Sequence, residues 1–423
     1  MPDATTTTID LSDLDGFWTA PLTQRAAGFA ALRESPGIPF YDQPPSPVPE
    51  PGAGFYALTR YDEVVEASRT PGVFRSGPGA TSVADMPPEW NEFFGSMINT
   101  DDPRHARLRR IVSRGFTPRR LADLQDSIER TARTIVGDLL AAGECEGVET
   151  VSARLPLATI CEMMGIPESH HRFVYDRTNV ILGASDPEYV PPGSDMVTAL
   201  LTAAGELAAL VRELGEARRA EPTGDVVSAL VNAEIDGEHL TPEELASFFV
   251  LLVVAGNETT RNATSWGLQL LTEHPEQRAA WLADPDGVTA SAVEEIVRWA
   301  SPVIYMRRTL SEPAVLGGTE LPAGAKTALF YWSANRDPER FADPEAFDVR
   351  RSPNPHLGFG GPGPHFCLGA HLARRQLSAL FTELLRRAPR VATTGEPRRL
   401  RSMFINGITR LPLTADGGPG VLA

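Results

Sequence analysis

The chain has 423 residues, of which 42% are hydrophobic, 22% charged and 7% aromatic, and its 39 basic and 55 acidic side chains give a formal charge of −16. The apolar fraction excludes intrinsic disorder, and the negative charge argues against nucleic-acid binding, which needs positive surface. The three cysteines are widely spaced and form no CxxC pair. This spacing argues against a disulfide framework or structural zinc and favours a reducing compartment.

No targeting or membrane segment is expected. The N-terminal stretch MPDATTTTID lacks the basic and apolar regions of a signal peptide. The longest apolar run, Phe248 to Ala255, is far shorter than the ~20 residues that a membrane span requires. We therefore expect a soluble, cytoplasmic protein without a membrane span.

The first half of the chain is expected to be mainly helical. Residues 44–54 form a proline-rich connector, and the following twenty-residue stretch, 55–74, reads as a short strand, a turn at Arg60–Asp62 and a short helix. Helical patterns then dominate 103–232, interrupted by a loop rich in glycine and proline at 183–194.

The clearest predicted helix begins after Thr241. Thr241 is suited to cap the helix, Pro242 suits the first helical position, and Glu244 completes a capping box. Because the next helix breaker is Pro275, this helix could run for ~30 residues, or about 45 Å. A helix of that length, apolar near its middle, would cross the centre of one large domain.

The second half adds two helices, over 292–300 and 368–387. Between them lie two strand-like pieces, 303–310 and 326–332, and a long irregular stretch over 337–366. An irregular stretch of this length normally has a function, and here it leads to a cysteine.

That cysteine, Cys367, follows a loop of glycine and proline and directly precedes a predicted helix, in the segment GFGGPGPHFCLG (358–369). At a helix N-terminus unpaired N–H groups and the helix dipole favour a thiolate, and a thiolate bound to haem iron promotes O–O cleavage. An inert buried cysteine and a nucleophile paired with His365 are the alternatives. The segment also satisfies the dinucleotide pattern GxGxxG, but no strand precedes it.

The loop resembles the cysteine signature of the cytochrome P450 monooxygenases, and three companion motifs follow that family's order. They are HARLR (His105–Arg109), AGNETT (Ala255–Thr260) and EIVR (Glu295–Arg298). The resemblance implies the cytochrome P450 fold, mainly α with small sheets, as a single domain over 1–423 with flexible tails at 1–12 and 415–423. It also implies haem b, O2 as co-substrate and electrons from NAD(P)H through redox partners.

The resemblance also implies which residues hold the cofactor. Cys367 is the expected axial ligand of the haem iron. The haem propionates are expected to be held, through charge-assisted hydrogen bonds, by His105, Arg109, Arg308 and His365. Arg307 competes with Arg308, which is preferred because the family has its arginine two residues before an apolar position, here Leu310.

The remaining motifs are assigned to proton transfer and to structure. Glu258 and Thr259 are the expected catalytic pair, an acid beside a hydroxyl that delivers protons. The hydroxyl of Thr259 is expected to turn away from its own helix. Gly256 could let a ligand approach or allow close helix packing. Glu295 and Arg298 are expected to form a structural ion pair.

Two positions depart from the family pattern. The phenylalanine that usually lies seven residues before the cysteine is Gly360 here, with Phe359 one place earlier. Ala346 stands where many members carry an arginine, which leaves Arg351 as the candidate third partner of Glu295 and Arg298.

A narrower resemblance concerns the substrate. Segments such as LLVVAGNETTRNA and AVEEIVRWASPVIYMRRTL resemble actinobacterial hydroxylases of methyl-branched lipids, and cholesterol and cholestenone side-chain hydroxylases are close relatives. The match is poor over the first 50 residues and over 184–225. The resemblance implies terminal hydroxylation of a branched lipid or sterol side chain. A natural-product tailoring hydroxylase and a non-catalytic haem or lipid binding protein are the alternatives. The expected apolar pocket walls are Ile181, Leu182, Phe249, Val253, Val303, Ile304, Met306, Phe404 and Ile405.

Arginines cluster in two segments that are expected to form a basic face on the thiolate side of the haem, despite the negative total charge. They are Arg104, Arg107, Arg109, Arg110, Arg114, Arg119, Arg120, Arg374 and Arg375. A basic face of this kind would attract an acidic electron donor, so we expect a ferredoxin and its ferredoxin reductase as partners. A solvated helix face is the alternative.

Overall fold

The computed structural model describes residues 9–45, 52–233 and 240–416. Its helices are α1 (Leu22–Glu34), α2 (Tyr61–Arg69), α3 (Pro88–Gly95), α4 (Arg104–Ser113), α5 (Pro118–Asp123), α6 (Gln125–Ala142), α7 (Arg154–Met164), α8 (His171–Gly183), α9 (Met196–Ala220), α10 (Val226–Val231), α11 (Pro242–Glu273), α12 (Pro275–Ala283), α13 (Pro285–Ala300), α14 (Tyr331–Ala334) and α15 (Ala370–Arg387). Shorter helical segments lie at Ser96–Asn99, Arg114–Phe116, Val148–Ser152, Glu168–His170 and Pro187–Tyr189.

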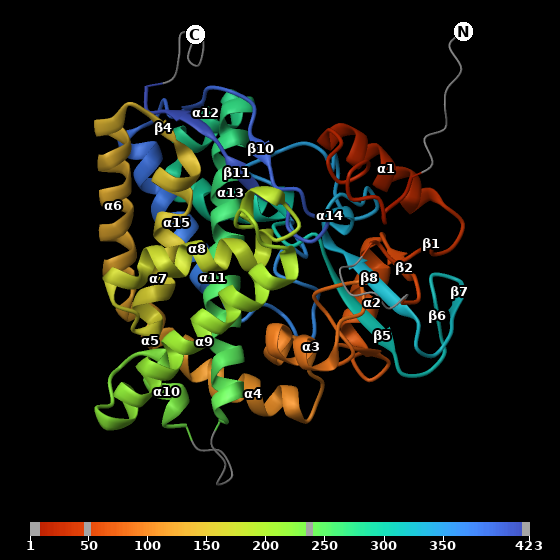
Figure 1. Cartoon of the computed structure of the whole chain (residues 1–423). Coiled ribbons are helices and arrows are strands. Elements are labelled where there is room, and N and C mark those ends of the chain that lie inside the picture. Colours follow the sequence, from red (N-terminus) through yellow and green to blue (C-terminus); the bar gives the residue numbers. More distant parts are fainter. Residues whose placement is uncertain (1–8, 46–51, 234–239, 417–423) are drawn as a thin grey trace.

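The strands are short and form four small sheets. They are β1 (Phe40–Tyr41), β2 (Phe55–Leu58), β3 (Phe74–Arg75), β4 (Glu144–Glu146), β5 (Tyr305–Leu310), β6 (Ala314–Leu316), β7 (Thr319–Leu321), β8 (Lys326–Phe330), β9 (Ala392–Thr393), β10 (Arg398–Arg399), β11 (Ile408–Arg410) and β12 (Pro412–Thr414). The largest sheet has the order β1-β2-β8-β5-β3, with β2 and β8 parallel and the other pairs antiparallel. Figure 1 shows this sheet beside a larger body of helices.

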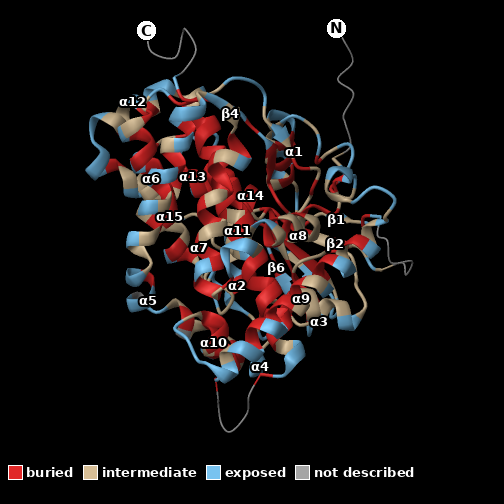
Figure 2. Cartoon of the chain, turned by 60° about the vertical axis from the view of Figure 1, so that its left-hand side comes forward, coloured by how far each residue is buried: buried red, intermediate tan, exposed pale blue. Residues whose placement is uncertain are grey.

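Helix α11 crosses the middle of the helical body, as the sequence predicts. Thr241 accepts a hydrogen bond from the backbone N–H of Glu244, whose side chain accepts one in return, so the capping box is present and the helix runs for 32 residues. Buried residues fill the interior around α11 and α13, and exposed residues lie on the outer faces (Figure 2). Because α11 is covered on all sides, it is apolar around most of its circumference.

The N-terminal and C-terminal parts of the chain share the largest sheet. Phe55 of β2 pairs with Lys326 of β8, and Leu58 pairs with Leu329. One apolar cluster likewise joins Leu11, Trp18 and Phe330. Pairings between segments so far apart in the sequence favour the single-domain expectation.

Three element boundaries differ from the sequence predictions. Helix α13 begins at Pro285, not at 292, because Asp284 caps it by accepting from the N–H of Gly287. Helix α15 begins at Ala370, not at 368, and α2 already begins at Tyr61, within the expected turn. The predicted connector at 44–54 lies partly outside the described residues, which omit 46–51.

The expected flexible tails lie mostly outside the described residues, which include only 9–12 and 415–416 of them. Leu11 is fully buried and its carbonyl accepts a hydrogen bond from the Trp18 indole at 2.9 Å, and Ala415 is buried at the other end. Within the described ranges, no helix is both long and apolar enough to cross a bilayer.

Candidate active site

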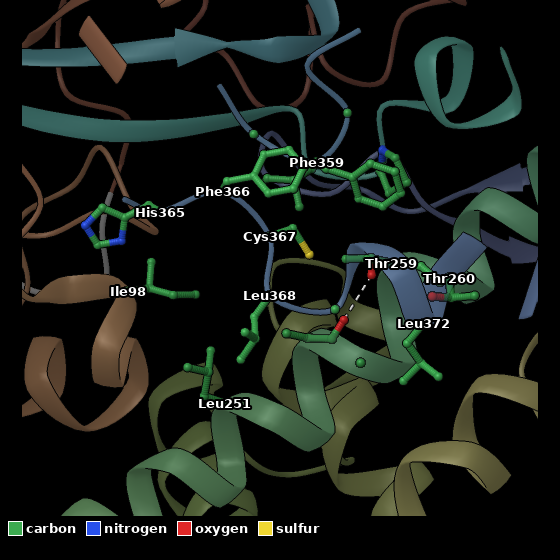
Figure 3. Close-up of a pocket in the computed structure, with 18 of the residues that line it drawn as sticks. Ile98, Leu251, Thr259, Thr260, Phe359, His365, Phe366, Cys367, Leu368 and Leu372 are labelled. Atoms are coloured by element: carbon green, nitrogen blue, oxygen red, sulfur yellow. Dashed lines mark hydrogen bonds between the residues drawn. The ribbon is translucent and has the colours of Figure 1, made fainter. Parts of the chain in front are cut away.

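A cavity of ≈ 230 Å³ lies between the middle of α11 and the loop that precedes α15. Ala255, Gly256 and Thr259 keep free surface in the middle of a helix whose neighbouring residues are buried, because they face this cavity. Cys367 lies deep inside the protein and also keeps free surface, and its sulfur points into the same space (Figure 3). The cavity therefore lies between the predicted thiolate and α11, the helix that carries the predicted catalytic pair.

The backbone of the 358–367 loop fixes Cys367. The carbonyl of Phe359 accepts a hydrogen bond from the backbone N–H of Cys367 at 3.0 Å. Between them the chain turns at Gly360 with a φ of +87°, a conformation that side-chain-bearing residues rarely adopt. This explains the departure from the family pattern: the turn requires glycine at 360, and the phenylalanine ring lines the cavity from position 359.

Two opposing effects act on the pKa of the Cys367 thiol. Burial raises it above the usual range, and the backbone N–H groups of Gly369 and Ala370 and the charges of Arg109 and Arg374 oppose that rise. The helix N-terminus thus favours the thiolate in the direction that the sequence predicts, but desolvation outweighs it. A cation in the cavity, such as a metal ion, is what would hold the sulfur as a thiolate.

Four polar residues predicted to hold the cofactor gather on the cavity wall: His105, Arg109, Arg308 and His365. The two imidazole rings lie 4.1 Å apart, centroid to centroid. Burial, reinforced by the charge of Arg308, lowers the pKa of His365 to about 3, and burial also lowers the pKa of His105. Both imidazoles are thus neutral at neutral pH, and the positive charge of this wall comes from the two arginines.

Neither arginine forms an ion pair with any residue that the structure describes. Arg109 donates to the carbonyl of Phe366 at 2.7 Å, and Arg308 donates to the carbonyl of Arg307 at 2.7 Å. Arg307 instead pairs with Asp85 at 2.8 Å and does not line the cavity. Of the two competing arginines, Arg308 is the one placed at the cavity, because alternate residues of β5 face opposite sides.

The predicted catalytic pair is split between two environments. Thr259 faces the cavity and its hydroxyl donates to the carbonyl of Ala255 at 2.9 Å, so it turns toward its own helix and not away from it (Figure 3). Glu258 is fully buried beside the cavity wall, where it forms an ion pair with Arg261. Burial raises the pKa of Glu258, and the charge of Arg261 opposes that rise.

Gly256 serves helix packing. A Cβ at this position would lie 3.1 Å from Cδ1 of Ile160 on α7. The missing side chain therefore lets α7 approach α11 closely, which is the packing alternative that the sequence left open. The backbone of Gly256 still borders the cavity.

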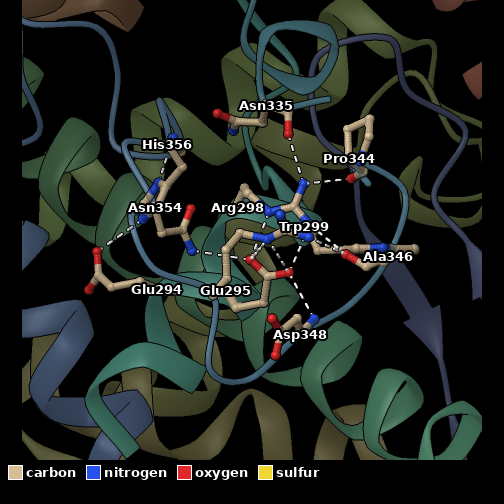
Figure 4. A network of polar contacts seen from close by, with 12 residues as sticks. Glu294, Glu295, Arg298, Trp299, Asn335, Pro344, Ala346, Asp348, Asn354 and His356 are labelled. Carbon is tan, nitrogen blue, oxygen red and sulfur yellow. Dashed lines mark hydrogen bonds and ion pairs between the residues drawn. The ribbon is translucent and has the colours of Figure 1, made fainter. Parts of the chain in front are cut away.

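Glu295 and Arg298 form the predicted ion pair within a larger network (Figure 4). Arg298 donates through Nε at 2.7 Å and Nη2 at 2.8 Å to the two carboxylate oxygens of Glu295. Arg351 donates through Nε to both oxygens at 3.1 Å, so it is the third partner that the sequence suggested. Asn354 and the backbone of Asp348 also donate to Glu295, and neither was expected.

The cavity walls were predicted poorly. Of the nine apolar residues expected there, only Val303 and Met306 line the cavity. Phe249 and Val253 are instead fully buried in the core. The walls that the sequence missed are Met97, Ile98, Phe116, Leu251, Leu252, Pro302 and Tyr331. On α11 a signal existed: Leu251, Ala255 and Thr259 are spaced by four residues and so share one face.

Comparisons with known proteins agree with this geometry. The family model described as "Cytochrome P450" matches residues 194–284 and 287–399. A methyl-branched lipid omega-hydroxylase of Mycobacterium tuberculosis is 48% identical over 98% of this chain and 96% of its own length. The chain belongs to the cytochrome P450 family.

Two further relatives of this cytochrome P450 are informative. A steroid C26-monooxygenase of Rhodococcus jostii is 38% identical over 92% of this chain and 82% of its own length. A cytochrome P450 of Mycobacterium marinum, solved in complex with pseudoionone, has 42% identity and a TM-score of 0.92, covering 98% of this chain and 100% of that one. The cytochrome P450 fold and monooxygenase chemistry are thereby confirmed, with haem b as cofactor, O2 as co-substrate and redox partners as the source of electrons.

The residues of this cytochrome P450 fit haem. Arg308 is a buried cation and Arg109 a half-buried one, and neither has an acidic partner in the described chain. A cation removed from water requires an anion such as a propionate. Nε2 of His105 is buried and has no hydrogen-bond partner among the described residues. Cys367 offers a soft sulfur ligand in the same cavity. Propionates and iron would satisfy all of these groups at once.

Proposed function

We propose that this cytochrome P450 hydroxylates the terminal methyl group of a methyl-branched lipid or of a sterol side chain. The observation that carries the proposal is the apolar cavity between Cys367 and α11, which Thr259 lines. The lipid and steroid hydroxylases among its relatives supply the substrate class.

The cavity suits the end of a hydrocarbon chain. Met97, Ile98, Leu251, Leu252, Val303 and Met306 form its apolar walls. Each buried methylene of a substrate contributes ~0.8 kcal/mol to binding. A methyl branch against such walls should therefore tighten binding by roughly fourfold relative to an unbranched chain of the same length.

The chain's own residues provide binding, proton transfer and charge balance. We assign Cys367 as the axial ligand of the haem iron, and His105, Arg109, Arg308 and His365 as the groups that hold the propionates. Bound haem supplies the activation of O2 and the oxidising power for attack on a C–H bond. Thr259 holds a proton at Oγ1 beside the reacting centre, and Glu258 replenishes it from the side of α11 that faces away from the cavity.

Electrons would come one at a time from a ferredoxin that a ferredoxin reductase reduces with NAD(P)H, in the cytoplasm. The expected basic face partly supports this partner. Arg110, Arg119 and Arg120 are exposed, whereas Arg104, Arg107 and Arg374 form ion pairs with glutamates. The side chain of Arg114 lies outside the described residues. The exposed arginines are the part of this face that an acidic donor could contact.

A spectral titration of the purified haem protein tests the proposal. Methyl-branched fatty acids and sterols should shift the haem to high spin, and an unbranched chain should bind about fourfold more weakly. A shift with macrolides or polyketides but with neither lipid would replace this proposal by a natural-product tailoring hydroxylase. A reduced carbon monoxide complex without a red-shifted Soret band would exclude Cys367 as a thiolate ligand.

A further inference from the structure

A second pocket, of ≈ 500 Å³, opens on the surface beside α8. Its walls come mainly from α8, the segment 188–192, β4 and β11, and we call it the α8 pocket. The residues that line it are Glu146, Glu149, Arg172, Tyr175, Asp176, Asn179, Val180, Glu188, Tyr189, Val190, Pro191, Pro192, Thr409 and Arg410. Helix α8 packs directly against α11 (Figure 1).

The side chains around this pocket carry more negative than positive charge. Arg172 pairs with Asp176 at 2.9 Å, and Arg410 pairs with Glu188 at 2.8 Å. Glu146 accepts backbone N–H groups, including that of Leu411 at 2.8 Å. Because Glu146 and Glu149 add two carboxylates to these two ion pairs, the pocket disfavours an anionic ligand, and its polar walls favour water.

A polar chain leads from the floor of the α8 pocket to the buried acid on α11. Tyr175 hydrogen-bonds to the side chain of Asn179. The Asn179 carbonyl oxygen accepts a hydrogen bond from Nη1 of Arg261 at 2.5 Å. Arg261 in turn holds Oε2 of Glu258. Tyr189 packs closely against the end of α8: a Cβ on Gly183 would lie 2.4 Å from its ring.

Three buried polar atoms next to this chain have no hydrogen-bond partner in the described structure. They are Oδ1 of Asn257, Oε1 of Glu258 and Nε of Arg261. All three residues are at most 2% exposed. Buried polar groups of native proteins are almost always satisfied, and where no protein partner exists an internal water takes that place. Internal water is therefore the expected partner of these three atoms, which belong to residues next to the polar chain.

We propose that the α8 pocket is where protons enter this enzyme, and that internal waters pass them by way of Asn179 and Asn257 to Oε1 of Glu258. The inference rests on the proposed function, because it needs Glu258 and Thr259 as the proton-delivering pair. Arg261 cannot itself pass a proton at neutral pH, so its part is to clamp Oε2 and leave Oε1 facing the water.

The overall reaction determines how many protons must pass through the α8 pocket. Hydroxylation of RH consumes O2, two electrons and two protons, and yields ROH and H2O. For each proton, an O–H bond of a water breaks as an O–H bond forms at Oε1 of Glu258, and bulk water in the α8 pocket replaces the proton. No electron moves along this route, and the electrons are supplied by the redox partner.

The variant Asn179→Leu tests the route, because it removes the polar floor and keeps a similar volume. We expect ferredoxin-driven product formation to fall about tenfold or more and its solvent deuterium isotope effect to rise. Hydroxylation driven by hydrogen peroxide, in which H2O2 and RH give ROH and H2O without added protons or electrons, should stay within about twofold of wild type. The matched control is Val180→Leu, a neighbouring wall residue outside the polar chain, which should change neither rate.

Unchanged ferredoxin-driven turnover and isotope effect in Asn179→Leu would overturn the proposal, and so would an equal fall in both reactions, which indicates a structural defect. Ferredoxin-driven hydroxylation absent from the wild type would instead count against the proposed function. A crystal structure of the wild-type holoenzyme gives a test that does not depend on the variant. It should show ordered water within hydrogen-bond distance of Oε1 of Glu258, continuous with the α8 pocket, and a dry Oε1 would refute the route.

Discussion

Two buried glutamate–arginine pairs share the same spacing and have opposite surroundings. Glu295 and Arg298 lie on α13, and Glu258 and Arg261 lie on α11, each pair three residues apart and almost fully removed from solvent. Around the first pair, Asn354, Arg351 and backbone groups complete every hydrogen bond. Around the second, one carboxylate oxygen and one guanidinium nitrogen lack a partner in the described chain.

The surrounding hydrogen-bond partners distinguish the two ion pairs, which their spacing in the sequence does not. An ion pair whose every donor and acceptor is satisfied by protein holds segments together, here α13 and the irregular 337–366 stretch (Figure 4). A pair with unsatisfied atoms beside a surface pocket leaves room for water and for proton movement. We infer that the α13 pair stabilises the fold and that the α11 pair serves the reaction.

The largest expected effect is on Glu295. Glu295→Gln leaves Arg298 and Arg351 buried without their carboxylate, which should cost about 3–5 kcal/mol of unfolding free energy and much of the bound haem. Urea unfolding and haem content measure this loss. The neighbouring Glu294→Gln is the control, because Glu294 is partly exposed. A Glu295→Gln protein as stable as the control would show that the α13 pair is not structural.

The second effect is on Glu258. Glu258→Gln keeps the shape of the side chain and removes its ability to gain and lose a proton, so turnover should fall roughly 100-fold while haem content stays near normal. Steady-state product formation and the carbon monoxide spectrum measure the two quantities. If stability falls as far as in Glu295→Gln while turnover per haem is unchanged, the two pairs do the same job and the contrast fails.

Thr259→Ala sharpens the contrast on the cavity side. Removing the hydroxyl should divert electrons to hydrogen peroxide, lowering product per NAD(P)H by about tenfold. Thr264→Ala is the matched control, since Thr264 makes the same bond to the helix, to the Thr260 carbonyl at 2.9 Å, outside the cavity lining. Full coupling in Thr259→Ala, or equal uncoupling in both variants, would contradict the role of this hydroxyl.

The smallest effect comes from Glu294, at the edge of the α13 network. Burial would raise its pKa, but hydrogen bonds from Arg374 and His356 outweigh burial and lower the pKa to about 2, from 4.5. A lowered carboxyl pKa stabilises the fold above pH ~4.5, and that stability is lost as the pH falls toward ~2. After allowance for partial exposure, Glu294→Gln should cost about 1–2 kcal/mol near neutral pH.

Urea unfolding at about pH 7, 5 and 3.5 checks the sign of this dependence. The difference between wild type and Glu294→Gln should be constant at the two higher values and smaller at the lowest. Glu320→Gln, on an exposed position of β7, is the control and should cost nothing measurable. A difference that grows on acidification would mean that the pKa of Glu294 is raised, not lowered.

Local signals in the sequence predicted their features well. The capping box at Thr241 and Glu244 located the start of α11 because it depends on residues within one helical turn. The order of the motifs placed Cys367, His105, Arg109, Arg308 and His365 at one cavity. From the sequence, Arg351 was only a candidate partner of Glu295, because this contact depends on the path of an irregular stretch.

Features set by packing were not predictable in the same way. Helix α11 is apolar around most of its surface, so hydrophobicity alone did not show which stripe faces the cavity, and Phe249 and Val253 were chosen where Leu251 and Leu252 line it. The pKa of the Cys367 thiol depends on desolvation by segments distant in the sequence. The water-bearing side of Glu258 likewise appears only when α8 is in place.

Product analysis with isotopically labelled O2 tests the proposed reaction most directly. The purified protein, a ferredoxin, its reductase and NAD(P)H would be supplied with a methyl-branched fatty acid, and the product examined by mass spectrometry. One labelled oxygen atom on a terminal methyl carbon is the predicted result. A label at an in-chain carbon, or no labelled product from a substrate that shifts the haem to high spin, would contradict terminal hydroxylation.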